Sequence, residues 1–320
     1  MSTTRTAPPH TPTNTAPLFG QPLSRSEDER LLSGKGKYLD DLGHGALIAA
    51  FVRSPHAHAR ITAIDIDDAL AMPGVHAVYT YDDLEADSAE MAEGLPLLIP
   101  HPAIVAPRNG FPLAKDEVNH VGEAIVMVIA TNRYVAEDAC AVIDVRYDIL
   151  EPVVGIDTAR VAARRVHDDV PDNVAAHLQH GFGDIDAELA AAPHRITLDL
   201  NIERSAAMPM EGKGVYARWD SDEETLTFWS STQTSTSVRA AVAARLGMAM
   251  NKIHCIAPDV GGGFGVKIMH PWPEEVMVTW AARQLGRAGI SNEVKWVEDR
   301  REHFISSAHE RAQVQEVTLG

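Results

Sequence analysis

Residues 259–267, "DVGGGFGVK", set four glycines around a single phenylalanine and end on a lysine. Glycine tolerates positive φ and lets a backbone approach another group closely. The run therefore predicts a tight loop, whose backbone N–H groups either line a nest for a ligand or only close a turn. The glycine pattern alone leaves both interpretations open. The candidate binding residues of this loop are Gly261, Gly262, Gly263, Phe264 and Gly265.

The common phosphate motifs do not fit this loop. A P-loop needs glycine directly before the lysine and Ser or Thr after it, whereas Val266 precedes Lys267 and Ile268 follows it. A dinucleotide fingerprint that starts at Gly261 would need a further glycine at position 266, which is valine. We therefore do not expect a nucleotide phosphate here.

The segments around the loop have clear patterns. We expect a strand over 252–258 before it and a helix that starts at Pro273 and ends at Gly286. Upstream, 214–220 and 224–230 predict a hairpin, and 195–203 alternates as a strand with one apolar face. A helix capped by Ser235 or Ser237 carries an apolar stripe and ends at Gly247; the stripe consists of Val238, Ala241, Val242 and Leu246.

The first half alternates short strands and helices. Residues 64–66 and 75–81 predict strands with a short helix between them, and 120–130 is a continuous apolar run typical of a buried strand. A helix over 132–141 and a half-buried strand over 142–149 follow. Residues 85–112 are rich in Pro and acids, which favours a long loop or an excursion. The fold class is α+β.

At 320 residues the chain predicts two domains. We expect a disordered arm over 1–19, a first domain over 20–155, a linker over 156–175 and a second domain over 176–320. Residues 312–320 read as a strand without its hairpin partner, an open edge. A gene split into two subunits, a truncated reading frame and a strand completed by another chain all remain open as explanations.

Composition restricts the function. A net charge of −17 disfavours nucleic acid and anionic membranes, and no apolar run approaches a membrane span. The two cysteines, Cys140 and Cys255, lie in apolar segments, so we expect buried thiols in a reducing, cytoplasmic compartment. An iron–sulfur cluster needs about four thiolates, so this chain is not expected to hold one.

Other candidate residues have weaker patterns. His56 and His58 share a strand face, but a metal site needs three or four ligands. Glu211 is interpreted either as a residue that orients its neighbours or as an exposed carboxylate at a hairpin start. The run 299–302 predicts a solvated salt-bridge cluster.

Two motifs together resemble a known family. The loop "GGGFGVK" (261–267) follows "SSTQTSTSVRAAVAARLGM" (230–248), and Gln233 precedes Phe264 by 31 positions. This combination resembles the molybdenum-cofactor-binding large subunit of the xanthine dehydrogenase, aldehyde oxidase and aerobic carbon monoxide dehydrogenase family. The resemblance extends over most of the chain, and the segments that carry it are 34–42, 53–61, 67–84, 111–130, 136–153, 181–192, 208–220 and 294–304.

The resemblance implies a fold and a site. The first domain would be the α/β hammerhead domain, and the second would be the first, incomplete part of the molybdopterin-binding domain. Gln233 would hydrogen-bond an oxygen of the metal, Phe264 would form a pocket wall, and Gly261, Gly262, Gly263 and Gly265 would carry the cofactor. No direct protein ligand to the metal is implied. Under the opposite interpretation, Phe264 only anchors the turn in the core and Gln233 is a surface residue.

The resemblance also implies chemistry and partners. The cofactor would be molybdenum-molybdopterin, in that form or as the cytosine dinucleotide, and the reaction would oxidise an aldehyde, heterocycle or CO-type carbon with water as the oxygen source. Partners would be iron–sulfur and FAD subunits and, for a split enzyme, a C-terminal large-subunit chain with the catalytic Glu, in a multimeric complex. FAD is not expected on this chain. Xanthine-type members have Glu where this chain has Ile268, which disfavours purines.

Two alternatives stay open beside the split enzyme. The chain is then either a truncated, catalytically inactive fragment or a non-catalytic binding or assembly module. His303, His309 and Arg311 fall where the family chain passes towards its substrate region.

Overall fold

The computed structural model describes residues 19–97, 100–161, 163–268 and 271–320. The chain divides into two compact units, residues 1–36 and 37–320. The first unit contains α1 (Asp28–Leu32). Asp28, the first residue of this helix, forms an ion pair with Arg25, and its Oδ1 lies 2.8 Å from Arg25 Nε. The predicted arm over 1–19 lies outside the described residues except for Phe19.

The second unit contains the remaining elements. Its helices are η1 (Leu39–Asp41), α2 (Asp67–Leu70), α3 (Tyr81–Asp87), α4 (Ala89–Ala92), α5 (Arg133–Val142), α6 (Ile156–Val161), α7 (Ile185–Ala191), α8 (Ser235–Leu246), η2 (Met250–Lys252), α9 (Pro273–Arg287) and α10 (Arg300–Ser306). Its strands are β1 (Leu47–Arg53), β2 (Ala59–Asp65), β3 (Val75–Tyr79), β4 (Glu117–Val118), β5 (Ala124–Ala130), β6 (Asp144–Ile149), β7 (Ile196–Ser205), β8 (Gly214–Asp220), β9 (Thr225–Ser230), β10 (Ile253–Ile256), β11 (Glu293–Val297) and β12 (Glu310–Leu319).

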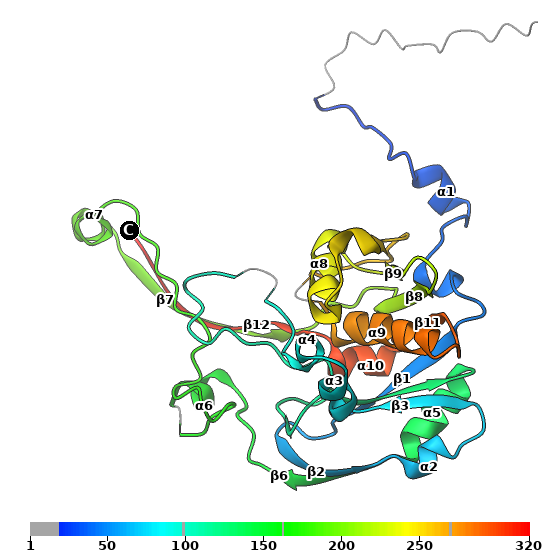
Figure 1. The fold of residues 1–320 in the computed structure, drawn as a ribbon. Coiled ribbons are helices and arrows are strands. Elements are labelled where there is room, and N and C mark those ends of the chain that lie inside the picture. The colour runs from blue at the N-terminus through cyan, green and yellow to red at the C-terminus, as the bar shows by residue number, and fades with distance from the viewer. Residues whose placement is uncertain (1–18, 98–99, 162, 269–270) are drawn as a thin grey trace, which may run out of the picture. The chain divides into compact units, whose positions relative to one another are not determined.

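A seven-stranded mixed sheet runs through the unit in the order β10-β9-β8-β11-β1-β5-β3 (Figure 1). Three of its strands come from the first half of the sequence and four from the second. The two halves meet where β1 pairs in parallel with β11, with Leu47 opposite Val294 and Ile48 opposite Lys295. The predicted first and second domains thus share one sheet, and the boundary predicted at 156–175 stays a prediction.

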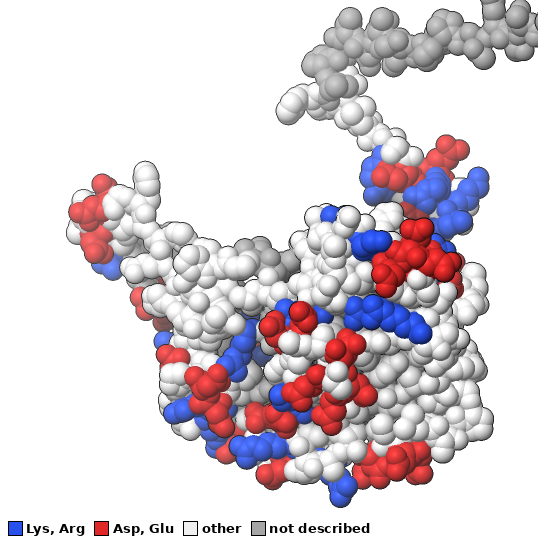
Figure 2. Space-filling view, in the orientation of Figure 1, with Lys and Arg blue, Asp and Glu red and all other residues white. Residues whose placement is uncertain are grey.

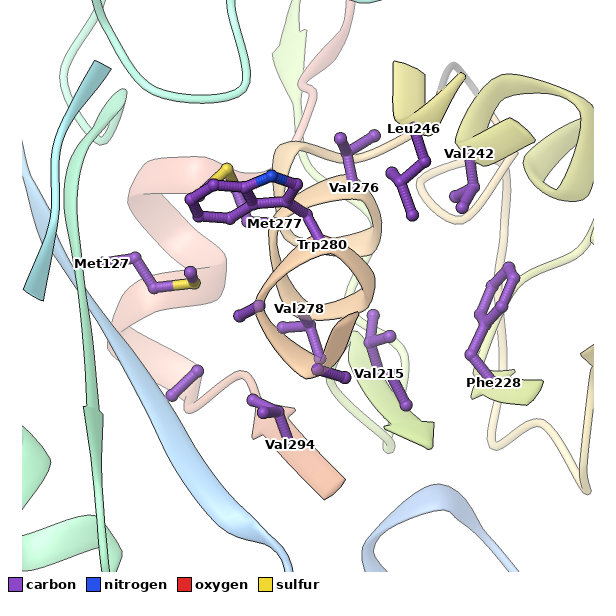
Figure 3. Packing of buried hydrophobic residues seen from close by; sticks show 14 of the residues in the cluster. Met127, Val215, Phe228, Val242, Leu246, Val276, Met277, Val278, Trp280 and Val294 are labelled. Atoms are coloured by element: carbon purple, nitrogen blue, oxygen red, sulfur yellow. The ribbon is translucent and has the colours of Figure 1, made fainter. Parts of the chain in front are cut away.

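Helix α9 builds the main core against this sheet. It packs on β8, β9 and β11 and against α8, and Figure 3 shows its side chains between the strands and that helix. The buried residues at this junction include Met127, Val215, Phe228, Val242, Leu246, Val276, Met277, Val278, Trp280 and Val294. Removing this much apolar surface from water is the main favourable term that holds the glycine loop's flanking elements in place.

Several predicted elements are confirmed. The apolar run became β5, which is buried along its whole length, and Asn132 caps α5 by accepting from Val135 N at 3.1 Å. The hairpin is β8–β9, and α8 buries its predicted stripe and ends at Gly247 with φ +60°. Residues 85–112 are not all loop, because α3 ends and α4 lies within them.

The end of α9 differs from the prediction. Gly286 does not end the helix, which continues to Arg287. A Cβ at position 286 would lie 2.5 Å from Trp219 Cδ1. This glycine therefore allows close packing on β8 and does not act as a helix terminator.

The strand near the end of the sequence also differs from the prediction. We expected residues 312–320 to lack a partner, but β12 pairs antiparallel with β7 along its length. The two form a ribbon, with α7 at one end of it in Figure 1. The alternating apolar face predicted for 195–203 is present, but its side chains are exposed, from 36% at Ile202 to 60% at Ile196.

A small sheet, β4-β2-β6, completes the unit. Acidic and basic side chains lie intermingled on the face shown in Figure 2. Across the described ranges, every helix is too short or too polar to cross a bilayer.

Candidate functional site

The glycine loop connects β10 to α9 and is shaped by its own backbone. Gly262, Phe264 and Gly265 have φ of +99°, +49° and +93°. Val266 N donates to Gly263 O at 3.0 Å and Ile268 N donates to Gly265 O at 3.4 Å, so two successive turns close the loop. Position 265 has a left-handed φ, which glycine adopts without steric strain and other residues do not. This explains why the residue is glycine.

Gln233 lies between β9 and α8 and contacts the loop directly. Its Oε1 accepts a hydrogen bond from Gly265 N at 3.1 Å, and its backbone N donates to Lys267 O at 2.9 Å. A Cβ at Gly263 would lie 2.4 Å from Gln233 Cδ. Gln233 is thus brought against residues 30 and 32 positions away, and glycine at 263 is required for the contact.

This arrangement leaves several hydrogen-bond donors unused. Gly262, Gly263 and Phe264 donate no backbone N–H to any part of the chain that the structure describes, and the Gln233 Nε2 group is equally unpaired there. Because the Gln233 oxygen is already bonded, its NH₂ group is the end left to contact a ligand. The loop and Gln233 together offer a cluster of hydrogen-bond donors, and neither contributes a charged acceptor group to it.

Phe264 lies at the surface of this chain. Its side chain is 68% exposed, so the alternative in which it only anchors the turn in the core is wrong. Phe264 is also a non-glycine residue at positive φ, a strained backbone position of the kind that clusters at functional sites. Its predicted role as a pocket wall stays a prediction.

Glu211 is the functional candidate that the sequence left undecided. Its Oε2 accepts from Gly261 N at 2.8 Å and from Lys267 Nζ at 3.0 Å. Lys267 is fully buried, and burial lowers its pKa while the Glu211 carboxylate partly offsets that effect. Glu211 therefore orients the loop and is not simply an exposed hairpin carboxylate.

A second buried charge cluster lies next to it. Lys213 Nζ is 3.3 Å from Glu298 Oε1, and His303 Nδ1 is 2.8 Å from Glu298 Oε2. Despite burial, hydrogen bonds and the positive charge of Lys213 lower the pKa of Glu298 to about 2. His303 is thus part of the structural core, where it also contacts Ala207 O at 2.9 Å.

The predicted solvated cluster over 299–302 is wrong in part. Glu302 Oε1 pairs with the buried Arg53 at 2.6 Å, and Asp299 caps α10 by accepting from Glu302 N at 2.7 Å. Arg300 Nη2 donates to Pro209 O at 2.8 Å. The run therefore fastens α10 to the rest of the unit.

The remaining candidates do not join the site. His58 Nε2 lies 2.8 Å from Glu117 Oε1 and His56 packs edge-on against Tyr147; within the described ranges no group of three metal-binding side chains occurs. Cys140 and Cys255 are half-buried, and burial raises the pKa of both thiols. His309 is exposed, and Arg311 pairs with its neighbour Glu310 at 3.4 Å.

The site lies on an open surface. The two large pockets, about 1300 and 920 Å³, are lined by other residues, and neither includes Gln233 or residues 261–265 among the described residues. Ligand sites usually bury most of the ligand. The donor cluster therefore lies outside both of these pockets, at the surface beside the exposed Gln233 and Phe264.

Comparison with known proteins agrees with this geometry. A family model for the aldehyde oxidase and xanthine dehydrogenase a/b hammerhead domain matches residues 33–151, and one for the molybdopterin cofactor-binding domain matches residues 166–320. The nicotine 6-hydroxylase large subunit of Paenarthrobacter nicotinovorans is 39% identical over 95% of this chain and 36% of its own length. The carbon monoxide dehydrogenase large chain of Hydrogenophaga pseudoflava is 35% identical over 89% of this chain and 35% of its own length.

Solved structures give the same result. Quinoline 2-oxidoreductase from Pseudomonas putida 86 superimposes with a TM-score of 0.83 at 35% identity, over 92% of this chain and 36% of that one. The chain spans about a third of the length of the relatives that it matches. The matches to the hammerhead domain and to the molybdopterin cofactor-binding domain, together with these relatives, show that the chain belongs to the xanthine dehydrogenase, aldehyde oxidase and carbon monoxide dehydrogenase family of molybdenum-cofactor-binding large subunits.

Proposed function

We propose that Gln233 and the loop over 261–265 hold the molybdenum end of a molybdopterin cofactor. The observation that carries the proposal is the contact between the two segments, in which Gly265 N–H fixes the Gln233 oxygen at 3.1 Å and Gly263 packs against the amide. That contact orients the free Gln233 NH₂ group beside the unpaired N–H groups of the loop.

The residues present fit such a group. Molybdopterin carries its metal on sulfur atoms of its own, so the protein needs to supply hydrogen bonds and shape, and it need not supply a thiolate. The loop offers backbone N–H donors at Gly262, Gly263 and Phe264 that have no partner among the described residues, next to the amide donor of Gln233. Donors of this kind suit oxygen acceptors, and preorganised donors cost little to align when the ligand binds.

The bound cofactor would supply two-electron redox chemistry for oxidising a carbon centre with water as the oxygen source. In that reaction Gln233 orients one oxygen acceptor, the loop N–H groups hold the cofactor, and the exposed Phe264 ring excludes water from one side. None of these groups is a general base. We propose that a second polypeptide provides the base and closes the open side, as a C-terminal large-subunit chain would, and that iron–sulfur and FAD subunits accept the electrons.

The proposal also covers the class of substrate and the form of the cofactor. The relatives include a nicotine hydroxylase and carbon monoxide dehydrogenases, so an aldehyde, a heterocycle or a CO-type substrate is the class to test. Ile268 places an apolar side chain after Lys267, which favours a substrate without an anionic or purine-like group at that point. The cofactor form, with or without the cytosine dinucleotide, belongs to the same test.

The experiment is metal and pterin analysis of the purified protein. The chain is expressed in a host that makes molybdopterin, alone and with neighbouring genes that encode candidate partners, and molybdenum and pterin are measured per mole. We expect a complex that contains both, and a loss of most of the metal in Gln233→Ala. The matched control is Gln313→Ala, an exposed glutamine on β12 whose side chain bonds only Gln315, at 2.7 Å, among the described residues.

The outcomes separate the alternatives. A complex without molybdenum in any combination would contradict the proposal and support an inactive fragment. Retention of a small molecule without molybdenum would support a binding or assembly module. Equal metal in the Gln233→Ala and Gln313→Ala proteins would show that the assigned residues are wrong.

A further inference from the structure

Glu211 lies at the base of the glycine loop and joins three separate segments of the chain. One carboxylate oxygen accepts from Gly261 N at 2.8 Å and from Lys267 Nζ at 3.0 Å, and the other accepts from Leu39 N at 3.2 Å. The Glu211 backbone N also donates to Gly261 O at 3.1 Å. Gly261 and Lys267, which begin and end the GGGFGVK stretch, are therefore bound to the same side chain.

The contact is close and dry. A Cβ at Gly261 would lie 2.5 Å from Glu211 Cβ, so the loop backbone rests directly on this residue. Lys267 is fully buried, and its ammonium bonds to Glu211 and to no other acceptor within the described ranges. Removing one partner of such a buried ion pair is destabilising, because it leaves the other charge buried and uncompensated.

Lys267 carries the constraint on to Gln233. Its backbone O accepts from Gln233 N at 2.9 Å and from Thr232 Oγ1 at 3.2 Å. The side chain of Lys267 is thus fixed by Glu211, while its backbone fixes the segment that presents the Gln233 amide. One ion pair controls the position of both parts of the proposed site.

A glycine-rich loop has many backbone conformations available to it, and ordering it at the moment of binding would weaken affinity. We propose that Glu211 and Lys267 are positioning residues, which hold the loop in the one form that leaves the N–H groups of residues 262–264 available to the cofactor. The part of this inference that concerns the cofactor rests on the proposed function. The part that concerns loop order does not.

The test measures loop order, stability and cofactor content. These are compared between variants, both in the complex of the full chain with its partners and in the chain without cofactor. Glu211→Met removes both carboxylate oxygens, so the side chain can no longer accept from Gly261 or Lys267. Asp87→Leu is the matched control, because Asp87 also collects three donors, including the buried Arg283 at 3.1 Å, but lies on α3 away from the loop. Amide hydrogen exchange of residues 259–268 reports loop order directly.

We expect Glu211→Met to speed exchange at the bonded amides of Gly261, Gly265 and Val266 by about tenfold or more, and to lower the bound molybdenum and pterin. Asp87→Leu should lower the unfolding temperature without either effect. The double variant Glu211→Met/Lys267→Met removes the uncompensated charge, so its unfolding temperature should recover towards that of the unmodified chain. Its loop exchange and cofactor loss should not recover, because Gly261 N–H still lacks its acceptor.

The results have distinct meanings. Restored loop protection and cofactor in the double variant would overturn the positioning role and leave only a stability role. Unchanged exchange in Glu211→Met would overturn it as well. An unmodified complex without molybdenum would contradict the proposed function, while the exchange comparison would still decide whether Glu211 and Lys267 hold the loop.

Discussion

Gly263→Ala tests the contact on which the site depends. The new Cβ would lie 2.4 Å from both Cδ and Oε1 of Gln233 and 2.7 Å from its Cγ, too close for any real methyl contact. Gly263 is not among the residues with positive φ, so alanine fits the backbone there. The strain therefore falls on the Gln233 side chain, which is exposed and can move away.

The magnitude follows from what the movement breaks. Loss of the Gly265 N–H···Oε1 bond costs about 0.5–1.5 kcal/mol, and a less favourable rotamer costs about as much again. Alanine in place of glycine returns about 0.4–1 kcal/mol through the unfolded chain. We therefore expect the free energy of unfolding to fall by about 1–2 kcal/mol, while bound molybdenum falls severalfold because the Gln233 amide is displaced.

The assay combines urea unfolding with metal analysis, and a double-mutant cycle makes it specific. In a Gln233→Ala background the added methyl has room, so Gly263→Ala should there cost nothing further in stability or metal. Gly45→Ala is the control, since its Cβ would meet nothing within 4 Å. Additive losses in the cycle, or an unfolding cost above about 4 kcal/mol, would show that Gln233 does not absorb the strain and would refute the reasoning.

Burial raises the pKa of Glu275 to about 8 from an ordinary 4.5, so between those values the folded chain keeps a proton that the unfolded chain has lost, and stability falls as pH rises. Glu275→Gln should flatten the dependence of unfolding free energy on pH in that window by up to about 1.4 kcal/mol per unit, and unchanged pH curves would contradict this. Gly286→Ala should destabilise by about 1–3 kcal/mol in thermal unfolding, although alanine favours helices, because its methyl would lie 2.5 Å from Trp219; a rise in unfolding temperature would refute this. Trp280→Ala should cost about 3–5 kcal/mol in urea unfolding, as the ring is buried and its Nε1 donates to Asp87 at 2.9 Å; a cost under about 1 kcal/mol would argue against the packing of α9.

Local patterns were sufficient for several elements, including α8 beside the site and β5 at the other side of the sheet. The stripe of α8 and its terminal Gly247, and the continuous apolar run of β5, follow from periods and residue preferences within about ten residues. The spacing of 31 positions between Gln233 and Phe264 also predicted a shared site, and the structure places Gln233 against the loop at Gly263 and Gly265. These features depend on short-range geometry and on a pair of motifs that can be recognised in the amino-acid sequence.

Other features were decided by contacts between distant residues. The parallel pairing of β1 with β11, which joins the two halves in one sheet, and the pairing of β12 with β7 have no local signal, since strand partners are chosen by packing. The same holds for Gly286, whose role depends on the ring of Trp219.

By itself, the sequence determined the family and most of the strand and helix pattern around the loop, and it predicted which residues would contact the proposed cofactor. Only the tertiary structure decided how those residues are held. Glu211 could be read as a surface carboxylate until folding placed Gly261, Lys267 and Leu39 around it. A side chain's environment is set by the segments packed against it, and the local sequence around Glu211 does not indicate partners that lie 50 to 172 positions away along the chain.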